Sequence, residues 1–357
     1  MGVFAYYDAD TDAMVYHVIP SPESDLAPSN FHSETESLVS AATIESNDLP
    51  GYFILHHGRQ QPANDNAIKW FPSDNIRRYM LRYLVLKSIF GGDYIGPVMD
   101  ALSPVEGRER YVLEVGTRTG TWIQAMATQF SHVQFLSLDV VPMIAHAPRP
   151  NVAFEVYDFT AGLLLEDESQ DAVFLNVVLE MVKDYRSLLR EVYRILRPGG
   201  LIYIRDLNPH FWDTEDIMIP AHRTNPYGCR FFDLIRRCIS SAGIDPDTCD
   251  KLPQWLLPGS DLWNQEQVGF KDIHSVIRPF PVYPHDGFSC MNRIEEGIAT
   301  YLRQLTAMSL RDMSGLLRDT GMGGKEADEL IEGMLEELRQ PESSTYVVYC
   351  IIGSIKY

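Results

Sequence analysis

A glycine-containing segment stands directly behind a short apolar run of the sequence. The segment is Glu114-Val115-Gly116-Thr117-Arg118-Thr119-Gly120, and a stretch with helical spacing, Trp122 to Phe130, follows it. A loop between a strand and a helix can bring a ligand against bare backbone, because glycine has no Cβ in the way. Taken alone, Gly-x-x-x-Gly also fits a dinucleotide-binding fold or an ordinary tight turn.

Three carboxylates are placed around this loop at the ends of apolar runs. Glu114 stands two residues before the first glycine, Asp139 follows the loop by about 20 residues, and Asp158 has Phe159 beside it. A carboxylate such as that of Asp139 can accept hydrogen bonds from both hydroxyls of a ribose. Asp158 can accept one from an adenine amino group while a phenyl ring packs on the purine. The alternative role for Asp139 is that of a helix cap.

Apolar runs and helical patterns alternate through the middle of the chain. An order of this kind predicts a parallel sheet with right-handed crossovers. The expected strands are Tyr111 to Val115, Val133 to Asp139, Val152 to Tyr157, Ala172 to Val178 and Leu201 to Arg205. Amphipathic helices are predicted over Asp184 to Leu196, ended by Arg197-Pro198-Gly199-Gly200, and over Pro226 to Ala242.

Further elements are expected on both sides of this region. The N-terminus predicts a hairpin of Val3 to Tyr7 and Met14 to Val18, followed by a connector over residues 21–50. A helix with a wide apolar face is predicted from Asp74 to Gly91. The sixth and seventh strands are expected at Ile273 to Ile277 and Tyr346 to Ile352, with two or three helices between them over Ile294 to Leu338.

Together these motifs resemble the core of the class I S-adenosylmethionine-dependent methyltransferases. The likeness is closest to the fungal secondary-metabolite methyltransferases called LaeA-like. It spans Tyr111 to Arg205 and is carried by the glycine loop, Asp139, Val156-Tyr157-Asp158-Phe159 and the Leu196-Arg197-Pro198-Gly199-Gly200 helix end. The fold that it implies is α/β, a doubly wound, seven-stranded, mostly parallel sheet of the Rossmann-like kind, with ligands at the carboxyl ends of the strands.

The same resemblance implies a division of the chain. Residues 73–278 are expected to form the methyltransferase core, and residues 344–357 its final strand. Residues 1–72 are expected to hold the hairpin and connector and to serve partly as a substrate lid. Residues 279–343 are expected to form a helical insertion over the acceptor pocket.

The resemblance also implies S-adenosylmethionine as cofactor and assigns its contacts. Glu114, or backbone near it, would hold the amino end of the cofactor. The methionine moiety would lie along Gly116, Thr117, Arg118 and Gly120, the ribose on Asp139 with Val140 beside it, and the adenine on Asp158 and Phe159. Asn176, near the tip of the fourth strand, would lie beside the sulfonium, unless it is a satisfied polar group in a turn.

Arg118 is a departure from the family, because many members have glycine at this position. Its cation would either reach the methionine carboxylate of the cofactor or point to solvent. The loop also differs from the Gly-x-Gly-x-x-Gly of dinucleotide enzymes, so the following helix is not set up as a pyrophosphate cradle.

Methyl transfer from a sulfonium is an in-line displacement, which mainly requires alignment and exclusion of water. A hydroxyl acceptor also requires removal of a proton, for which histidine is suited near neutral pH. His210, just after the fifth expected strand, is the first candidate for this base, although an ordinary structural histidine is the stronger interpretation. His57, His222 and His285 are weaker candidates. We expect no metal, since no spaced set of ligands demands one.

Large rings surround the expected core, and they form either core or an apolar pocket for the acceptor. They are Trp70, Phe211, Trp212, Phe231, Phe232, Trp255, Trp263, Phe280 and Tyr283. The activity that we expect is transfer of a methyl group to oxygen or nitrogen of a small aromatic or lipophilic metabolite. The alternatives are a methyltransferase-like regulator that acts through protein partners and a cofactor-binding fold that catalyses a non-methylating reaction.

Composition narrows the partners and the compartment. The net charge of −19 over 357 residues argues against nucleic acid or an acidic membrane surface, since phosphate binding relies on Lys and Arg. The five cysteines form no CxxC pair and are expected to be reduced thiols. Without a secretory signal or an apolar run long enough to span a bilayer, a cytoplasmic protein is expected. The sequence leaves the oligomeric state open, a homodimer included.

Overall fold

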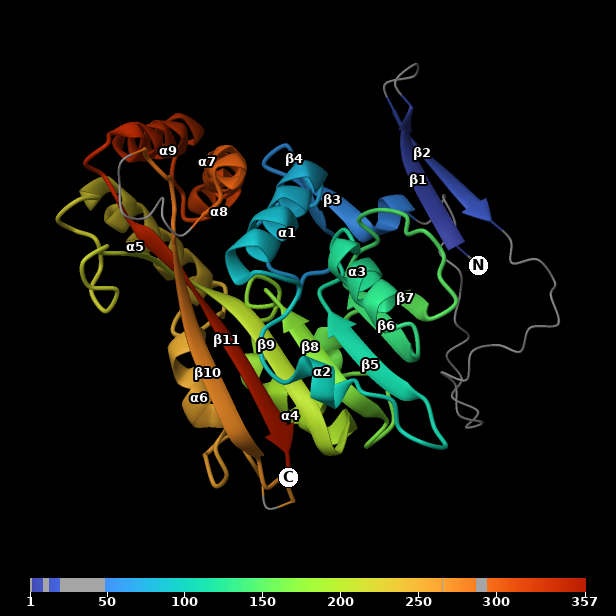
Figure 1. Ribbon diagram of the computed structural model, residues 1–357. Helices are drawn as coiled ribbons and strands as arrows, with labels where there is room; N and C mark the ends of the chain where they lie inside the picture. The colour runs from blue at the N-terminus through green and yellow to red at the C-terminus, as the bar shows by residue number, and fades with distance from the viewer. Residues whose placement is uncertain (1, 9–12, 20–48, 265, 287–293) are drawn as a thin grey trace.

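A seven-stranded sheet forms the centre of the computed structural model, which describes residues 2–8, 13–19, 49–264, 266–286 and 294–357 (Figure 1). The strand order is β10-β11-β9-β8-β5-β6-β7. Neighbours from β9 to β7 pair in parallel, whereas β11 pairs antiparallel with both β9 and β10. The strands are β5 (Arg110–Val115), β6 (Val133–Asp139), β7 (Val152–Val156), β8 (Gln170–Asn176), β9 (Leu196–Trp212), β10 (Phe270–Pro281) and β11 (Tyr346–Lys356). The predicted doubly wound, mostly parallel fold is confirmed.

Alternate residues of each central strand pack against helices on opposite faces of the sheet. On β5, Val112 belongs to the apolar cluster that holds α2 (Val98–Ala101) and α3 (Thr121–Gln129), whereas Leu113 belongs to the cluster on the other face. That second cluster includes α4 (Tyr185–Ile195), α5 (Pro226–Ser241) and α6 (Thr248–Leu256). A strand that buries both faces reads as a continuous apolar run, which is why these strands are visible in the sequence.

Strand β9 is longer than predicted. It was expected to end at Arg205 but continues to Trp212, because β11 pairs with it as far as Trp212. The sequence Asn208-Pro209-His210 interrupts the apolar run, so the pattern alone indicates an end that the partner strand overrides.

Helices also cover the carboxyl ends of the strands. The predicted first helix is α1 (Ile76–Phe90), and the region between β10 and β11 holds α7 (Glu296–Asp312), α8 (Ser314–Arg318) and α9 (Gly324–Arg339). Helix α7 packs on α1, and α9 packs on α5; Figure 1 shows α7, α8 and α9 grouped together on the α1 side of the molecule. None of the helices in the described ranges has the length and apolar character needed to cross a membrane.

Two antiparallel hairpins precede α1. The predicted N-terminal hairpin is present as β1 (Gly2–Asp8) and β2 (Ala13–Ile19), and a second one, β3 (Phe53–His56) with β4 (Arg59–Pro62), was not predicted. Most of the expected connector, residues 20–48, lies outside the described residues. Four of the five cysteines are buried and free, and Cys290 lies outside the described residues.

Candidate functional site

The glycine loop joins β5 to α3, and neighbouring groups of the protein itself require its two glycines. Gly116 has a φ of 94°, and a Cβ there would lie 3.1 Å from the backbone oxygen of Asn176. Gly120 has a φ of 64°, and a Cβ there would lie 2.5 Å from Nδ1 of His146. Both conformations favour glycine, and both positions lack room for a side chain. The close approach that we expected from a ligand is therefore already made by the strand tip and by the His146 ring.

Glu114 lies beneath the loop with its carboxyl group fully enclosed. Ser137 Oγ donates to one of its oxygens, and Asn176 Nδ2 donates to the other at 3.2 Å. Thr117 is tied to the same group, since its hydroxyl lies 2.7 Å from Ser137 Oγ. Burial raises the pKa of Glu114 to about 8, against the smaller effect of these hydrogen bonds. At neutral pH the side chain is therefore mostly protonated, and it joins the tips of β5, β6 and β8.

Asp139 holds the loop from the end of β6. Its two carboxylate oxygens accept hydrogen bonds from the backbone N–H groups of Arg118 and Val140, each at 2.7 Å. The side chain is buried, and burial raises its pKa although Arg118 and these N–H groups oppose the shift. Asp139 thus fixes the loop conformation but caps no helix, since α3 begins at Thr121 behind Gly120 and has no side-chain cap. Each oxygen has a second lone pair, so this role leaves room for a hydroxyl ligand.

The Arg118 side chain is largely buried and does not point to solvent. Its φ is 52°, and its Nη2 donates to Glu180 Oε1 at 2.7 Å. Glu180 also accepts two hydrogen bonds from Arg82 on α1, at 3.0 and 3.1 Å. Burial alone would raise the pKa of Glu180, but Arg82 and Arg118 outweigh it and lower that pKa. The residue that departs from the family is therefore part of a buried ion cluster.

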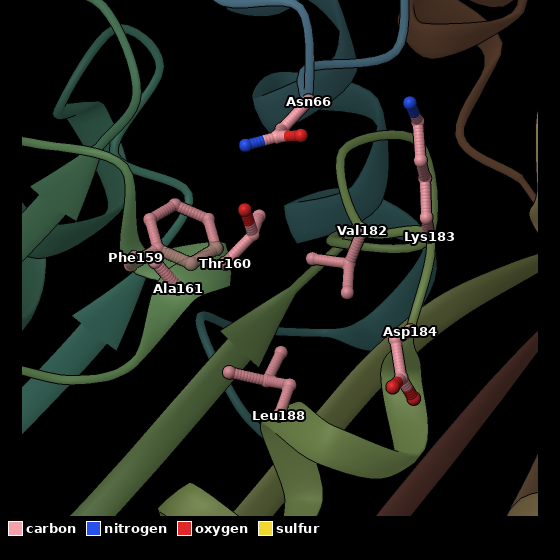
Figure 2. A pocket seen from close by; sticks show the side chains of 8 residues that line it. All are labelled: Asn66, Phe159, Thr160, Ala161, Val182, Lys183, Asp184 and Leu188. Carbon is pink, nitrogen blue, oxygen red and sulfur yellow. The ribbon is translucent and has the colours of Figure 1, made fainter.

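Phe159, the residue after Asp158, lines a pocket of about 200 Å³ beyond the end of β7. Figure 2 shows Phe159 and Thr160 on one side of it, Val182 and Lys183 on the other, and Asn66 above. Small-molecule sites usually have roughly 300 to 1,000 Å³, so this pocket suits one ring system rather than a whole nucleoside derivative.

Asn66 closes this pocket from the segment between β4 and α1. Its Nδ2 donates to Asp158 Oδ2 at 3.0 Å. Burial would raise the pKa of Asp158, but hydrogen bonds from Thr160, Asn64 and Asn66 outweigh it and lower that pKa. Asp158 is therefore an anion near neutral pH. The loop sequence before α1 gives no periodic signal, and for that reason sequence reasoning missed Asn66.

Asn176 stands at the tip of β8, between Glu114 and the loop. Its Oδ1 is enclosed, and none of the described residues donates a hydrogen bond to it. The next residue, Val177, has a φ of 54°, which is rare for a β-branched side chain. Strained backbone and an unpaired buried acceptor both carry a cost and are typical of functional sites. Asn176 is thus not the satisfied turn residue that was its alternative.

His210 is not brought to this cluster. It lies on β9 five residues beyond Arg205, which pairs with Asn176 across β8 and β9, so strand geometry separates the two by about 16 Å. Its ring contacts Trp212, and burial together with Arg236 lowers its pKa to about 4. Arg236 belongs to α5. The placement leaves the proposed role as general base without a geometric basis.

The aromatic residues divide between core and periphery. Phe211, Phe231 and Phe232 pack on one another in the core, and none of them lines the pocket beside Phe159 or the space beside Arg118. His56 and His57, at the turn between β3 and β4, both lie within 2.9 Å of Asp319 Oδ1. This group, outside the strand-end site, was not expected from the sequence, because its members are more than 260 residues apart.

Comparison with known proteins agrees with the topology. Residues 91–244 match the family model described as a methyltransferase domain. The chain is 25% identical over 263 residues to the secondary metabolism regulator laeA of Coprinopsis cinerea, covering 72% of this chain and 62% of that protein. It is 22% identical over 257 residues to the methyltransferase str2 of Strobilurus tenacellus, covering 71% of this chain and 86% of the relative.

Among solved structures, the phosphoethanolamine N-methyltransferase 2 of Haemonchus contortus with S-adenosylmethionine is similar over 83% of this chain and 62% of that chain. The identity is 16% and the TM-score 0.41, too low for a conclusion about substrate. Residues 91–244 thus match a methyltransferase domain, and the sheet around them is doubly wound and mostly parallel. The chain is similar to the class I S-adenosylmethionine-dependent methyltransferases and, among them, to the LaeA-like proteins.

Proposed function

We propose that this protein transfers a methyl group from S-adenosylmethionine to an oxygen or nitrogen atom of a small aromatic or lipophilic metabolite. The observation that carries the proposal is the convergence of Glu114, Asn176 and the glycine loop at the tips of β5 and β8, with the Phe159 pocket at the neighbouring end of β7. When bound, the sulfonium of the cofactor supplies an electrophilic methyl carbon and a neutral leaving group.

The groups at these strand ends fit the parts of the cofactor. The unpaired Oδ1 of Asn176 is an acceptor that suits an ammonium group, and the second lone pairs of Asp139 suit ribose hydroxyls. Phe159 offers a ring face and Asp158 an acceptor for adenine. These assignments make Glu114 a positioning residue, since it reaches a ligand through Asn176.

Residues 62–73 would have to move for the cofactor to enter. Pro62, Ala67, Ile68 and Phe71 line the narrow space beside Arg118 and Glu180, and Asn66 covers the adenine pocket. Closure of such a segment over bound ligand excludes water from the reaction. This segment, rather than the N-terminal hairpin, is therefore the part of residues 1–72 that we assign as a lid.

A second candidate is a regulatory role through protein partners. It rests on the similarity to a secondary metabolism regulator, of whose length the match spans 62%. In that case the cofactor site would be retained while the acceptor would be a protein or absent.

Labelled cofactor separates these functions. The protein is incubated with S-adenosylmethionine carrying a labelled methyl group and with a panel of phenols, carboxylic acids and amines. We expect label in at least one small molecule, and Asp139→Ala should abolish it together with binding of S-adenosylhomocysteine. Label found in protein alone would favour the regulatory candidate. Cofactor binding that survives Asp139→Ala at full affinity would contradict the ribose assignment.

A further inference from the structure

Arg205 is a buried cation without a counter-ion in the part of the chain that the structure describes. It is 5% exposed, and none of the described residues forms an ion pair or a side-chain hydrogen bond with it. Its Nε is fully enclosed and has no hydrogen-bond partner among the described residues. Burying a charge without a partner costs several kcal/mol.

Comparison with Arg78 shows how unusual this is. Arg78 is 1% exposed, and its Nε lies 3.0 Å from Asp312 Oδ2. Arg82 and Arg118, which are also largely buried, share Glu180. The fold thus supplies carboxylates to the other buried arginines near α1 but not to Arg205.

Its surroundings do not neutralise the charge. The Arg205 guanidinium lies 5.5 Å from the centre of the Phe90 ring, and such a contact is weaker than an ion pair with a buried carboxylate. Glu114 is the carboxyl group with the main electrostatic effect on Arg205. Burial raises the pKa of Glu114 to about 8, so this group carries little charge at neutral pH. Arg82 adds a second positive charge to the region.

Position relates Arg205 to the methyl-transfer end of the site. On β9 it pairs in register with Asn176 of β8, and its carbonyl accepts a hydrogen bond from the strained Val177 at 2.7 Å. The side chain lies on the α1 face of the sheet, where Phe90, Val177 and Tyr349 belong to one apolar cluster. A cation surrounded by aromatic and aliphatic groups matches a molecule with one carboxylate and an apolar body.

We propose that Arg205 anchors the carboxylate of the methyl acceptor, which makes the substrate a lipophilic or aromatic carboxylic acid. This inference rests on the proposed methyltransferase function. The acceptor is favoured over the cofactor's own carboxylate because β9 lies beyond β8 from the glycine loop, on the side away from β6 and the adenine pocket. Bidentate pairing with guanidinium would then fix the orientation of the acid.

Binding measurements in the presence of S-adenosylhomocysteine test the anchor. Aryl and alkyl carboxylic acids and the matching primary amides are titrated into wild type, Arg205→Met, Arg205→Lys and the control Arg78→Met. We expect at least one acid to bind wild type and its amide to bind at least tenfold more weakly. Arg205→Met should lose the preference, Arg205→Lys should keep part of it, and a folded Arg78→Met should keep all of it. Equal binding of acids and amides, no binding of any acid, or a preference that survives Arg205→Met would overturn the proposal.

Two further readouts separate the alternatives. Without ligand, Arg205→Met should melt at the same or a higher temperature than wild type, because it removes an unpaired buried charge, whereas Arg78→Met should melt lower. An equal fall in both variants would mean a structural role for Arg205 and sink the proposal. If Arg205→Met weakens S-adenosylhomocysteine but not 5′-methylthioadenosine, the anchor serves the cofactor's carboxylate and not the acceptor. Wild type that fails to bind S-adenosylhomocysteine would instead refute the methyltransferase function.

Discussion

Arg118 Nη2 lies 2.7 Å from Glu180 Oε1, so a side chain of the glycine loop is ion-paired to the segment that follows β8. Arg82 reaches the same carboxylate from α1 at 3.0 Å. All three side chains are at most 12% exposed. One carboxylate thus compensates two cations that come from separate parts of the chain.

Glu180→Gln should be strongly destabilising. The amide leaves Arg82 without its carboxylate and leaves Arg118 with only Asp139, 3.9 Å from its Nη1. Breaking a buried pair in this way costs about 3 to 5 kcal/mol. Denaturant unfolding should show this loss. Glu329→Gln is the matched control, because its pair with Lys325 is 67% and 91% exposed and should contribute about 0 to 1 kcal/mol. Similar losses in both variants would contradict a special role for the buried cluster.

The two loop glycines should respond differently to alanine. Gly120→Ala should be destabilising by about 1 to 3 kcal/mol from backbone strain and from contact with His146. Adding His146→Ala should recover part of this loss, since it removes the ring. Gly116→Ala faces the backbone oxygen of Asn176, which cannot be removed, so the same second substitution should not rescue it. Thermal melts of the four variants measure this, and equal rescue at both sites would be inconsistent with the structure.

The raised pKa of Glu114 predicts a pH-dependent stability. A carboxyl group whose pKa is about 8 in the folded protein and near 4.3 when unfolded binds protons more tightly in the native state. Its contribution is therefore fully present below pH 4 and is lost as the pH rises through 8. Glu114→Gln does not titrate, so its unfolding free energy relative to wild type should rise by on the order of 2 to 5 kcal/mol between pH 5 and pH 9. A constant difference over that range would show that Glu114 titrates normally.

Asn66→Ala should change the binding of the cofactor product and leave the stability of the fold nearly unchanged. It removes one hydrogen bond to Asp158 at the mouth of the adenine pocket, where the group is exposed, so the melting temperature should change little. The dissociation rate of S-adenosylhomocysteine should rise about threefold to tenfold if the segment before α1 retains the bound cofactor. Stopped-flow displacement measures this rate. Asp65→Ala, at an exposed position on the same turn, is the control, and equal rates for wild type and Asn66→Ala would argue against a lid.

The sequence was sufficient for the sheet and for the strand-end residues, because these depend on local patterns. Apolar runs alternate with helical patterns, and a carboxylate or glycine stands at the end of each run. This local pattern locates Gly116, Asp139 and the Asp158-Phe159 pair without knowledge of which residues lie beside them in the fold. Glu180 and Arg205 could not be found in this way. Their significance lies in which side chain faces them across strands or helices, and that depends on register and packing.

His210 shows the opposite error. Its position shortly after an expected strand end suggested the sheet edge, but pairing with β11 extends β9 and carries it past the site. The helix α6 was missed because it is short and contains Pro253, and the β3 to β4 hairpin was missed because each of its strands has only four residues.

The shared carboxylate of Glu180 ties the opening of α1 to that of the glycine loop. If either element separates from the other, a buried charge becomes exposed or loses its counter-ion. The two elements should therefore unfold locally as a single cooperative unit. Amide hydrogen exchange in residues 78–86 and 116–120 would then report one common opening free energy. A change that stabilises α1 should therefore also stabilise the glycine loop, and the reverse, through the Glu180 side chain.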